Sequence, residues 1–336
     1  MPKVVRFHRL GPPEVLEIEE LPLQEPGPGE VRLRVEAFGL NRSESQMRQG
    51  TYPMIDATMP SRVGKEAVGI VEAIGPGVQG VALGSRATTI PCFDMNKHGV
   101  YGETAVVPAF ALAPVPAGLS TVEATAIWQQ YLTAYGPLVE YARIQPGSVV
   151  LVTAATASVG HACIQLARAQ GGGTVIATTR SASKVDGLKA TGAHYVIVTD
   201  GTGLAASVMD LTAGKGADVI VDSISGPIVS ELADAGAYRS KLFLYGRLNE
   251  EPTPFPLITC MKKGMSIQGY TLWEIVRDPE MMKRAQRFIL DGLEAGRFRP
   301  IIDRVFRLAQ IHEAHAYMDA NRASGKLVVT VAPESV

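Results

Sequence analysis

A run of small residues at 154–160 is the part of the sequence best suited to bind a phosphate group. Dinucleotide-binding proteins use a G-x-G-x-x-G turn, whose small residues let the backbone approach a pyrophosphate at the start of a helix. The matching places here read Ala155-Thr156-Ala157-Ser158-Val159-Gly160, so only the last glycine is kept. We expect pyrophosphate contacts from Ala155, Ala157, Ser158, Val159 and Gly160. On the motif alone, a tight turn in another kind of α/β protein stays an alternative.

Hydroxyl and cationic side chains follow about twenty positions later, where a bound dinucleotide presents its adenosine ribose. The stretch 178–184 includes Thr179, Arg180, Ser181 and Lys184 and has no Asp or Glu. An acidic residue there would accept a hydrogen bond from the 2′-hydroxyl of NAD. Cations and hydroxyls instead bind a 2′-phosphate through charge-assisted hydrogen bonds. The predicted cofactor is therefore NADPH.

The elements that must hold these residues form a β-α-β unit. Val149–Thr153 is a short apolar run typical of a strand buried on both faces, and Thr174–Thr178 is a second such strand. Apolar residues recur at helical spacing between them. Further strands alternate with helices along the chain: Tyr195–Val198, Asp218–Asp222, Lys241–Tyr245 and Met265–Gln268. This rhythm predicts an α/β domain with a doubly wound parallel sheet, which binds ligands at the carboxyl ends of its strands.

The first 120 residues have a different pattern. Short alternating runs such as Val31–Val35 and Gly69–Ala73 are punctuated by Pro and Gly, which indicates an all-β domain. A capping box at Ser120 and Glu123 predicts the start of a long helix, Thr121–Ala142.

The last part of the chain is expected to rejoin this first domain. From about residue 302 the pattern predicts a helix, Ala309–Asn321, and a final strand, Lys326–Val331. The predicted domains are thus 1–122, completed by 302–336, and 123–301.

Composition narrows the class of protein. The chain has 336 residues, enough for two domains with their own cores. Its formal net charge is -1 and 19% of its residues are charged, which gives no electrostatic case for nucleic acid or a membrane surface. The cysteines, Cys92, Cys163 and Cys260, show no pairing pattern and fit a reducing compartment. We expect a cytoplasmic protein without a signal peptide or membrane span.

With these pieces in order, the chain resembles the medium-chain dehydrogenase/reductase superfamily, in its zinc-free quinone oxidoreductase (zeta-crystallin-like) and enoyl reductase branch. The resemblance runs essentially end to end. The stretches that carry it are GLNRSE (39–44), MRQGTYP (47–53), GKEAVGIVEAIGPGV (64–78), QYLTAYGPL (130–138), AATASVG (154–160), ATTRSASK (177–184), DSISG (222–226) and GKLVV (325–329). It implies a GroES-like first domain, a Rossmann second domain, a nicotinamide between them and a homodimer.

The zinc alcohol dehydrogenases of this superfamily offer an informative contrast. Where they hold catalytic zinc with two cysteines and a histidine, this chain has Asn41, Lys65 and Gln129. None of these is a suitable zinc ligand, and an ammonium group would repel the ion. Without a Lewis acid, alcohol oxidation is disfavoured. The expected reaction is hydride transfer from NADPH to a conjugated acceptor, such as a quinone or an α,β-unsaturated carbonyl compound.

The resemblance also assigns candidate site residues. Asn41 is expected to bind the nicotinamide ribose or the substrate oxygen, and Tyr52, which follows RQGT as in enoyl-thioester reductases, to deliver a proton. Each has a plainer alternative: Asn41 as a turn residue and Tyr52 as a packing residue. The remaining expected cofactor contacts are Gln130, Thr133, Ser223, Ile224, Tyr245, Gly246, Arg247, Gly269, Asn321 and Lys326. The tyrosine that relatives often carry near Thr199 is missing.

Other functions stay open. An enoyl-thioester reductase and a non-catalytic NADPH-binding protein of the crystallin kind are the alternatives. His312-Glu313-Ala314-His315 has its histidines three apart rather than four, and His315 falls on an apolar stripe. We therefore expect a hydrogen-bonded histidine of the core or of the domain interface instead of a metal site. The arginines at 284–304 are interspersed with acidic residues and read as a solvated face.

Overall fold

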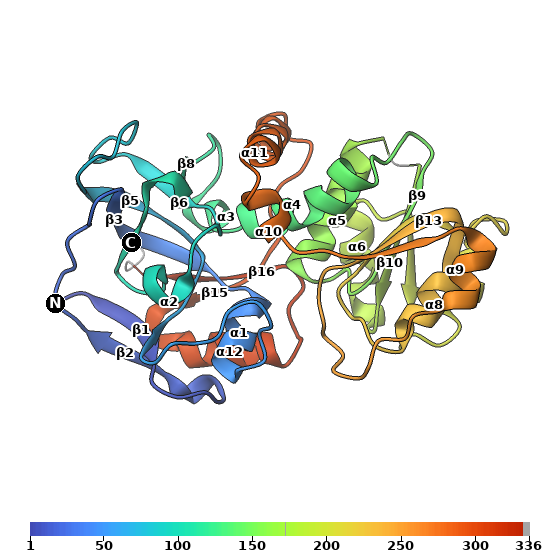
Figure 1. The fold of residues 1–336 in the computed structure, drawn as a ribbon, viewed down its shortest axis with the longest axis horizontal. Coiled ribbons are helices and arrows are strands. Elements are labelled where there is room, and N and C mark those ends of the chain that lie inside the picture. Colours follow the sequence, from blue (N-terminus) through green and yellow to red (C-terminus); the bar gives the residue numbers. More distant parts are fainter. Residues whose placement is uncertain (172, 332–336) are drawn as a thin grey trace. The chain divides into compact units, whose positions relative to one another are not determined.

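The computed structural model describes residues 1–171 and 173–331, which form two compact units (Figure 1). One unit contains Met1–Gln129 together with the chain from Pro300 onward, and the other contains Gln130–Arg299. The domain boundaries predicted from the sequence lie after residues 122 and 301. No helix in the described part of the chain is both long and apolar enough to cross a bilayer.

The second unit is built on a parallel sheet, as predicted. The strand order is β11-β10-β9-β12-β13-β14, and every neighbouring pair is parallel. The strands are β9 (Val149–Val152), β10 (Thr174–Thr179), β11 (Tyr195–Val198), β12 (Ala217–Asp222), β13 (Gly236–Leu244) and β14 (Ser266–Gly269). All residues of β9 are buried, as its continuous apolar run predicts for a central strand.

Helices cover both faces of this sheet, which makes it doubly wound. On one face α7 (Leu204–Leu211), α8 (Ile228–Ala235) and α9 (Leu257–Lys263) share a core with the sheet. On the other, α5 (Ser158–Ala169) packs on β9 and β10 beside α6 (Val185–Thr191). Further helices of the unit are η4 (Ala182–Lys184), α10 (Trp273–Val276) and α11 (Pro279–Glu294).

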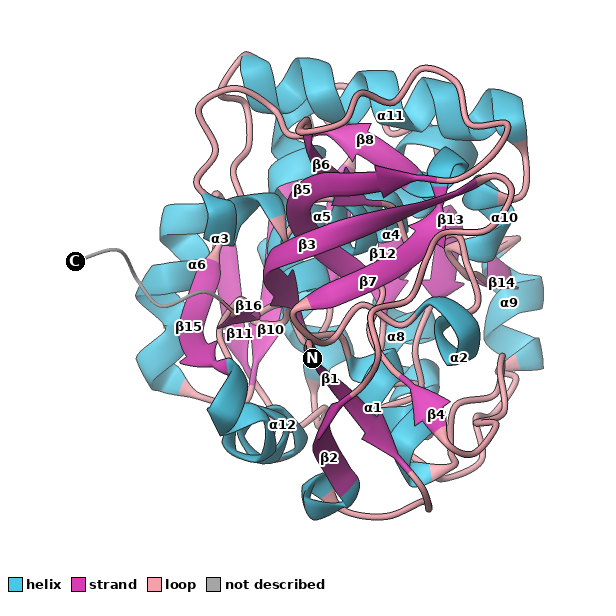
Figure 2. Ribbon diagram, turned by 90° about the vertical axis from the view of Figure 1, so that its left-hand side faces the viewer, coloured by secondary structure: helices cyan, strands magenta, loops and turns pink. Residues whose placement is uncertain are grey.

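The first unit is mainly β, and Figure 2 shows its strands together with α1 (Arg42–Gln49) and α12 (Ile311–Asp319). The larger sheet has the order β15-β16-β3-β5-β6-β8, with β7 also paired to β3, and a smaller one has the order β2-β1-β4. The strands are β1 (Lys3–Phe7), β2 (Leu16–Glu20), β3 (Glu30–Gly39), β4 (Ser61–Arg62), β5 (Glu66–Ile74), β6 (Arg86–Thr89), β7 (Thr104–Pro108), β8 (Leu112–Pro114), β15 (Ile302–Arg307) and β16 (Lys326–Thr330). The short helices are η1 (Pro13–Val15), α2 (Met95–His98), η2 (Ala109–Ala111) and η5 (Leu308–Gln310). Because β16 pairs with β3, the end of the chain completes this unit.

The single helix predicted over Thr121–Ala142 is wrong. The segment contains α3 (Thr121–Ala124), α4 (Trp128–Tyr135) and a π-helix, η3 (Gly136–Tyr141). The predicted capping box is confirmed, because Glu123 N donates to Ser120 Oγ and Ser120 N donates to the Glu123 carboxylate. Pro137 has no N–H to continue an α-helical ladder, which accounts for the change of helix type at η3.

A helix that the sequence analysis did not predict, α1, lies between β3 and β4. Its residues are almost all polar, so it lacks the apolar periodicity by which helices are recognised. Its boundaries are nonetheless marked in the sequence: Asn41 and Glu44 form a capping box, and Gly50, at φ 75°, ends the helix in the left-handed region.

Candidate active site

The turn before α5 leaves backbone donors open. Ala154 has φ 43°, in the left-handed region, and Ala155 N donates to Thr178 O at 3.1 Å, which fixes the turn against β10. Ala157 is the N-cap of α5 and provides no side-chain cap. No acceptor in the described chain takes the N–H groups of Ser158, Val159 and Gly160. Open N–H groups at a helix start suit an anion such as a pyrophosphate.

Gly160 has a steric reason to be glycine. A Cβ atom at this position would lie 2.5 Å from Ala155 O, closer than real contacts allow. The helix therefore approaches the preceding turn at the distance that the last glycine of the fingerprint permits. Ala155, in contrast, has room for its methyl group and is fully buried.

The end of β10 gathers hydroxyls and a cation. Thr179 is buried, and its Oγ1 accepts from Ser181 N at 3.2 Å. Arg180 is exposed and has neither a hydrogen bond nor an ion pair within the described residues. Lys184 ends η4, the short helix that follows. Together with the lack of a carboxylate in 178–184, this arrangement is suited to an anionic group beside the ribose.

The carboxyl ends of β12 and β13 bring further expected cofactor residues together. Gly246 approaches Ser223 so closely that a Cβ atom would lie 2.9 Å from Ser223 O. Asn249 N donates to Ile224 O at 2.9 Å, which ties the two loops. The hydroxyls of Ser223 and Tyr245 are buried close to each other, and neither makes a hydrogen bond of normal geometry with a group of the described structure. Unpartnered buried hydroxyls at the ligand-binding edge fit a bound polar molecule.

Asp222 anchors these two loops. Its carboxylate accepts from Thr153 Oγ1 and from Ser225 N, the latter at 2.7 Å. Burial raises the pKa of Asp222, and these hydrogen bonds oppose the shift. Ser225, at φ 58°, turns the chain here.

Four other residues that were expected to contact the cofactor lie on α4 and at the ends of β13 and β14. Gln130 and Thr133 are buried on α4, and Gln130 Oε1 lacks a hydrogen-bond donor in the described structure. Arg247 follows β13 and Gly269 ends β14, both exposed.

In the first unit, Asn41 lies in a buried polar network. Its amide Nδ2 donates to Glu44 Oε1 at 3.1 Å and to Glu66 Oε2 at 3.2 Å. Its Oδ1 accepts from Lys326 Nζ at 2.6 Å. Both amide hydrogens are therefore used inside the protein. A ligand hydroxyl can still donate to the second lone pair of Oδ1, so any ligand contact of Asn41 is as an acceptor.

The network holds the buried carboxylates of Glu44 and Glu66 together with the ammonium group of Lys326. Lys326 also pairs with Glu66, whose other oxygen accepts from Gln129 N at 2.8 Å. Glu44 accepts from Tyr101 Oη and from Lys65 N. Burial raises the pKa of Glu44, while hydrogen bonds from Tyr101 and Asn41 act in the opposite direction. Burial is also the main cause that raises the pKa of Tyr101.

The residues that stand where zinc alcohol dehydrogenases have their catalytic ligands all contact this network. Asn41 and Gln129 contact Glu66, and Lys65 N contacts Glu44. Amide and ammonium groups do not form a zinc site. In the described residues, the only cluster of potential metal ligands is His8, Glu17 and Glu19, which lies elsewhere on the β1–β2 hairpin.

Tyr52 and Lys65 are neighbours. Lys65 Nζ lies 3.3 Å from Tyr52 Oη and 4.8 Å from the centre of the phenol ring. Tyr52 is half-buried in the loop after α1.

Asn321, which was expected to contact the cofactor, is exposed. Its side-chain oxygen accepts a hydrogen bond from Arg42 at 2.5 Å, and its backbone has φ 55°, in the left-handed region.

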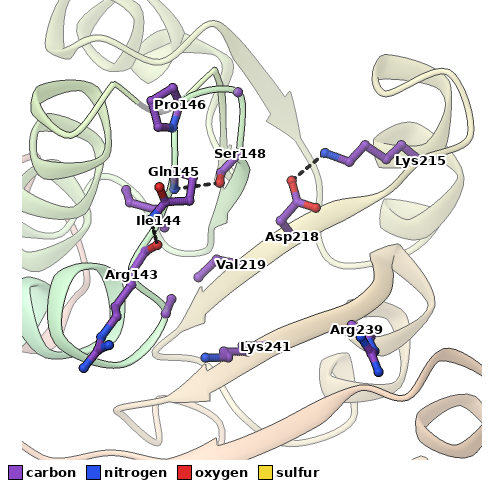
Figure 3. Close-up of a pocket in the computed structure, with 12 residues that line it drawn as sticks. Arg143, Ile144, Gln145, Pro146, Ser148, Lys215, Asp218, Val219, Arg239 and Lys241 are labelled. Atoms are coloured by element: carbon purple, nitrogen blue, oxygen red, sulfur yellow. Dashed lines mark hydrogen bonds and ion pairs between the residues drawn. The ribbon is translucent and has the colours of Figure 1, made fainter.

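A pocket of about 370 Å³ lies at the opposite edge of the parallel sheet (Figure 3). It is lined by residues that lead into the amino ends of β9, β12 and β13, and Lys215 pairs there with Asp218 at 2.7 Å. Arg143 and Arg239 extend to separate sides of it rather than converging. Since the fingerprint residues lie at the carboxyl ends, this pocket is not the expected dinucleotide site.

His315 lies in the core, as expected, but neither of its ring nitrogens has a hydrogen-bond partner in the described structure, so the expectation of a satisfied histidine is wrong. His315 is fully buried, and its ring packs edge-on against Tyr101 at 5.8 Å. Burial lowers its pKa to about 3, with a further contribution from Arg48. Of the arginines, Arg284 pairs with Glu140 and Arg287 with Asp291.

Two family models match the chain. The model described as the alcohol dehydrogenase GroES-like domain matches residues 27–117, and the zinc-binding dehydrogenase model matches residues 158–290. They confirm the predicted fold: a GroES-like domain with a Rossmann domain. The second description mentions zinc, although the places of the catalytic ligands here hold Asn41, Lys65 and Gln129.

Relatives cover nearly the whole chain. A 2-haloacrylate reductase from Burkholderia sp is 29% identical, over 96% of this chain and 97% of its own. A quinone oxidoreductase from Pseudomonas aeruginosa is 31% identical, over 98% and 99%.

Solved structures agree in fold. One described as an NAD-dependent alcohol dehydrogenase has a TM-score of 0.87 at 31% identity, over 99% of this chain and 100% of that one. A mycobacterial protein complexed with NADPH has a TM-score of 0.89 at 26% identity, over 98% and 100%.

Proposed function

Because the chain belongs to the medium-chain dehydrogenase/reductase superfamily, in its quinone oxidoreductase and enoyl reductase branch, we propose that it reduces a conjugated acceptor with NADPH and without a metal ion. The acceptor is a quinone or an α,β-unsaturated carbonyl compound. The chain is an oxidoreductase with an NAD(P)-binding Rossmann fold, as follows from its family.

The observation that carries the proposal is the buried network of Asn41, Glu66 and Lys326. Where the related zinc enzymes have metal ligands, this protein has an amide held between a carboxylate and an ammonium group. Such a site cannot lower the pKa of an alcohol as zinc does. It suits an acceptor that conjugation has already activated. The names of the relatives, a quinone oxidoreductase and a haloacrylate reductase, support the same class.

The residues of the second unit fit the cofactor. The open N–H groups of Ser158, Val159 and Gly160 would bind the pyrophosphate. Arg180 and Lys184, with the hydroxyls of Thr179 and Ser181, would bind the 2′-phosphate. Ser223 and Tyr245 offer buried hydroxyls to the ribose. When bound, the reduced nicotinamide supplies the hydride. The structure of the NADPH-bound mycobacterial relative supports this choice of cofactor for the fold, whereas the NAD-dependent neighbour makes it a question to test.

In the first unit we assign Asn41 and Lys326 to orientation of the ribose or the acceptor oxygen, and Tyr52 to proton delivery. Asn41 accepts a hydrogen bond in this role, because its donors are used. Gln130, Thr133, Ile224, Gly246, Arg247, Gly269 and Asn321 remain proposed contacts of the cofactor.

The test is a combined binding and turnover screen of the purified protein. NADPH and NADH are compared by the shift in thermal midpoint, and NADPH consumption is followed with quinones, short enals and enones, and enoyl thioesters. We expect the larger thermal shift with NADPH, and turnover with a quinone or an enal. Turnover of enoyl thioesters alone would identify an enoyl-thioester reductase. Tight NADPH binding without turnover of any acceptor would favour a non-catalytic binding protein and overturn the proposal.

A further inference from the structure

Lys65 carries a buried ammonium group whose partners are hydroxyls. The residue is 2% exposed, and Nζ lies 3.2 Å from Ser43 Oγ and 3.3 Å from Tyr52 Oη. No carboxylate of the described chain lies within ion-pair distance of Nζ. The backbone is fixed as well, since Lys65 N donates to Glu44 and Lys65 O accepts from Thr89 Oγ1. A buried ammonium without a direct counter-ion costs free energy, so a use for the charge is expected.

The chemistry of the two groups decides the direction of their hydrogen bond. An ammonium group only donates, so Tyr52 Oη is the acceptor in its contact with Lys65. The phenol's own proton is thereby left for another acceptor. If that proton is transferred, the phenolate that remains lies next to a positive charge in a site of low dielectric constant, which stabilises it.

We propose that Lys65 is a positioning residue that orients Tyr52 and stabilises the phenolate left after Tyr52 protonates carbon, and that the acceptor class is therefore α,β-unsaturated carbonyl compounds. The inference rests on the proposed reductase function. A hydride from the reduced nicotinamide forms a C–H bond at the β-carbon and leaves an enolate. The Tyr52 O–H bond breaks, its proton forms a C–H bond at the α-carbon, and water returns a proton to the phenolate.

Reduction of a quinone does not require a proton donor positioned at a carbon atom. Its reduction places both added hydrogens on oxygen in the final hydroquinone, and oxygen exchanges protons rapidly with water. Protonation of an enolate carbon is slow without a positioned acid. The Tyr52–Lys65 pair is thus useful for an alkene acceptor and dispensable for a quinone, which makes the two acceptor classes internal controls for each other.

The experiment compares turnover of an enone and a quinone by wild type, Lys65→Met, Lys65→Arg, Tyr52→Phe and the Lys65→Met/Tyr52→Phe double variant. Lys97→Met, at an exposed lysine of the same unit, is the matched control. We expect Lys65→Met and Tyr52→Phe each to lower the enone-to-quinone ratio of kcat by about tenfold or more. The double variant should lose little beyond either single one, since both act through one proton transfer. Lys65→Arg should restore most of the ratio, and Lys97→Met should keep it.

A second readout does not use activity. Thermal unfolding of the same four-variant cycle, without nucleotide, should show non-additive shifts in midpoint because the two side chains are in contact. Additive effects on both the kcat ratio and the midpoint, or an unchanged ratio in Lys65→Met, would overturn the inference while leaving the reductase function in place. A wild type that reduces neither acceptor would instead overturn the proposed function, and the assigned acceptor class with it.

Discussion

Gly39 leaves the space through which Lys326 reaches the buried network. A Cβ atom at Gly39 would lie 2.7 Å from Lys326 Cε and 2.4 Å from Thr125 O, and the second contact is with backbone. Gly39, the last residue of β3, thus has to lack a side chain so that the ammonium group of Lys326 can contact Asn41 and Glu66.

Gly39→Ala should therefore destabilise the first unit. We expect a loss of about 1 to 3 kcal/mol in the free energy of unfolding, as for other overpacked sites, measured by urea denaturation. Gly187→Ala in α6 is the matched control, because a Cβ atom there meets nothing within 4 Å. It should be neutral or stabilising by about 0.5 to 1 kcal/mol. Equal behaviour of the two variants would refute the steric argument.

Removal of the Lys326 ammonium alone should lower the stability of the protein strongly, whereas removal of both the ammonium and the Glu66 carboxylate should lower it much less. Lys326→Met leaves Glu66 buried without its ion-pair partner, for which a loss of about 3 to 5 kcal/mol is typical. In Lys326→Met/Glu66→Gln the remaining amide is neutral, and most of the stability should return. Chemical denaturation of the singles and the double measures this, and a double variant less stable than Lys326→Met would contradict it.

His315 should make stability depend on pH in mildly acid solution. Its pKa is about 3 in the fold, below the ordinary value of 6.5, so the unfolded chain binds a proton that the folded protein does not. Stability from this group is complete above pH 6.5 and is lost as the pH falls towards 3. The loss between pH 7 and pH 5 should be about 2 kcal/mol. Urea unfolding of wild type and His315→Met at both pH values tests this: the variant should be less sensitive to acid. A slope as steep as that of wild type would show that other groups cause it.

Arg180 should discriminate between the two nicotinamide nucleotides. It is exposed and has no partner among the described residues, so its guanidinium is available for a 2′-phosphate. Arg180→Ala should weaken NADPH binding by about tenfold or more, the worth of a charge-assisted hydrogen bond, and change NADH binding little. Arg239→Ala, at the other edge of the sheet, is the control in titrations followed by nucleotide fluorescence. Equal weakening of both nucleotides by Arg180→Ala would count against the assigned phosphate site.

The homodimer expected from the resemblance should form at the β14 edge of the second unit. β14 is an end strand, and the neighbouring helix α9 exposes Leu257, Ile258 and Met261 at 53%, 61% and 70%. Exposed apolar groups beside an unpaired strand edge are suited to association. Ile258→Glu should give monomers in light scattering, whereas Phe110→Glu, in the first unit, should not. A wild type that is monomeric at micromolar concentration would reject this prediction.

The parallel sheet could be predicted from sequence because its strands are buried, apolar and short. The predicted start and end of β9 and β10, for example, agree with the structure to within one residue. Helix α1 escaped the same reasoning because its signal lies in the capping residues Asn41 and Gly50 rather than in apolar spacing. The long helix predicted from Thr121 is interrupted twice. The first break, after Ala124, has no Gly or Pro to announce it, whereas the change to the π-helix η3 comes at Pro137, a breaker that was visible in the sequence.

The site was only partly accessible to sequence reasoning. The fingerprint turn is local, so Gly160 could be assigned from its neighbours. The contact of Lys326 with Glu66 joins residues 260 positions apart, and no local pattern announces it. The same holds for Lys65 and Tyr52, which meet because α1 and the loop after it bring the phenol back to β5. The sequence shows that Asn41 and Lys65 stand in place of metal ligands. It does not show which side chains they contact in the fold.

The pairing of β16 with β3 sets an order of events during translation. Every residue of the second unit has been synthesised once Arg299 has left the ribosome, so that unit can fold as soon as it emerges. The first unit must wait, because β16, which lies beside β3, and the ammonium of Lys326, which neutralises Glu66, are made after the whole second unit. A nascent chain that stops before Lys326 would thus contain every residue of the second unit, together with a first unit in which Glu66 lacks its ammonium partner.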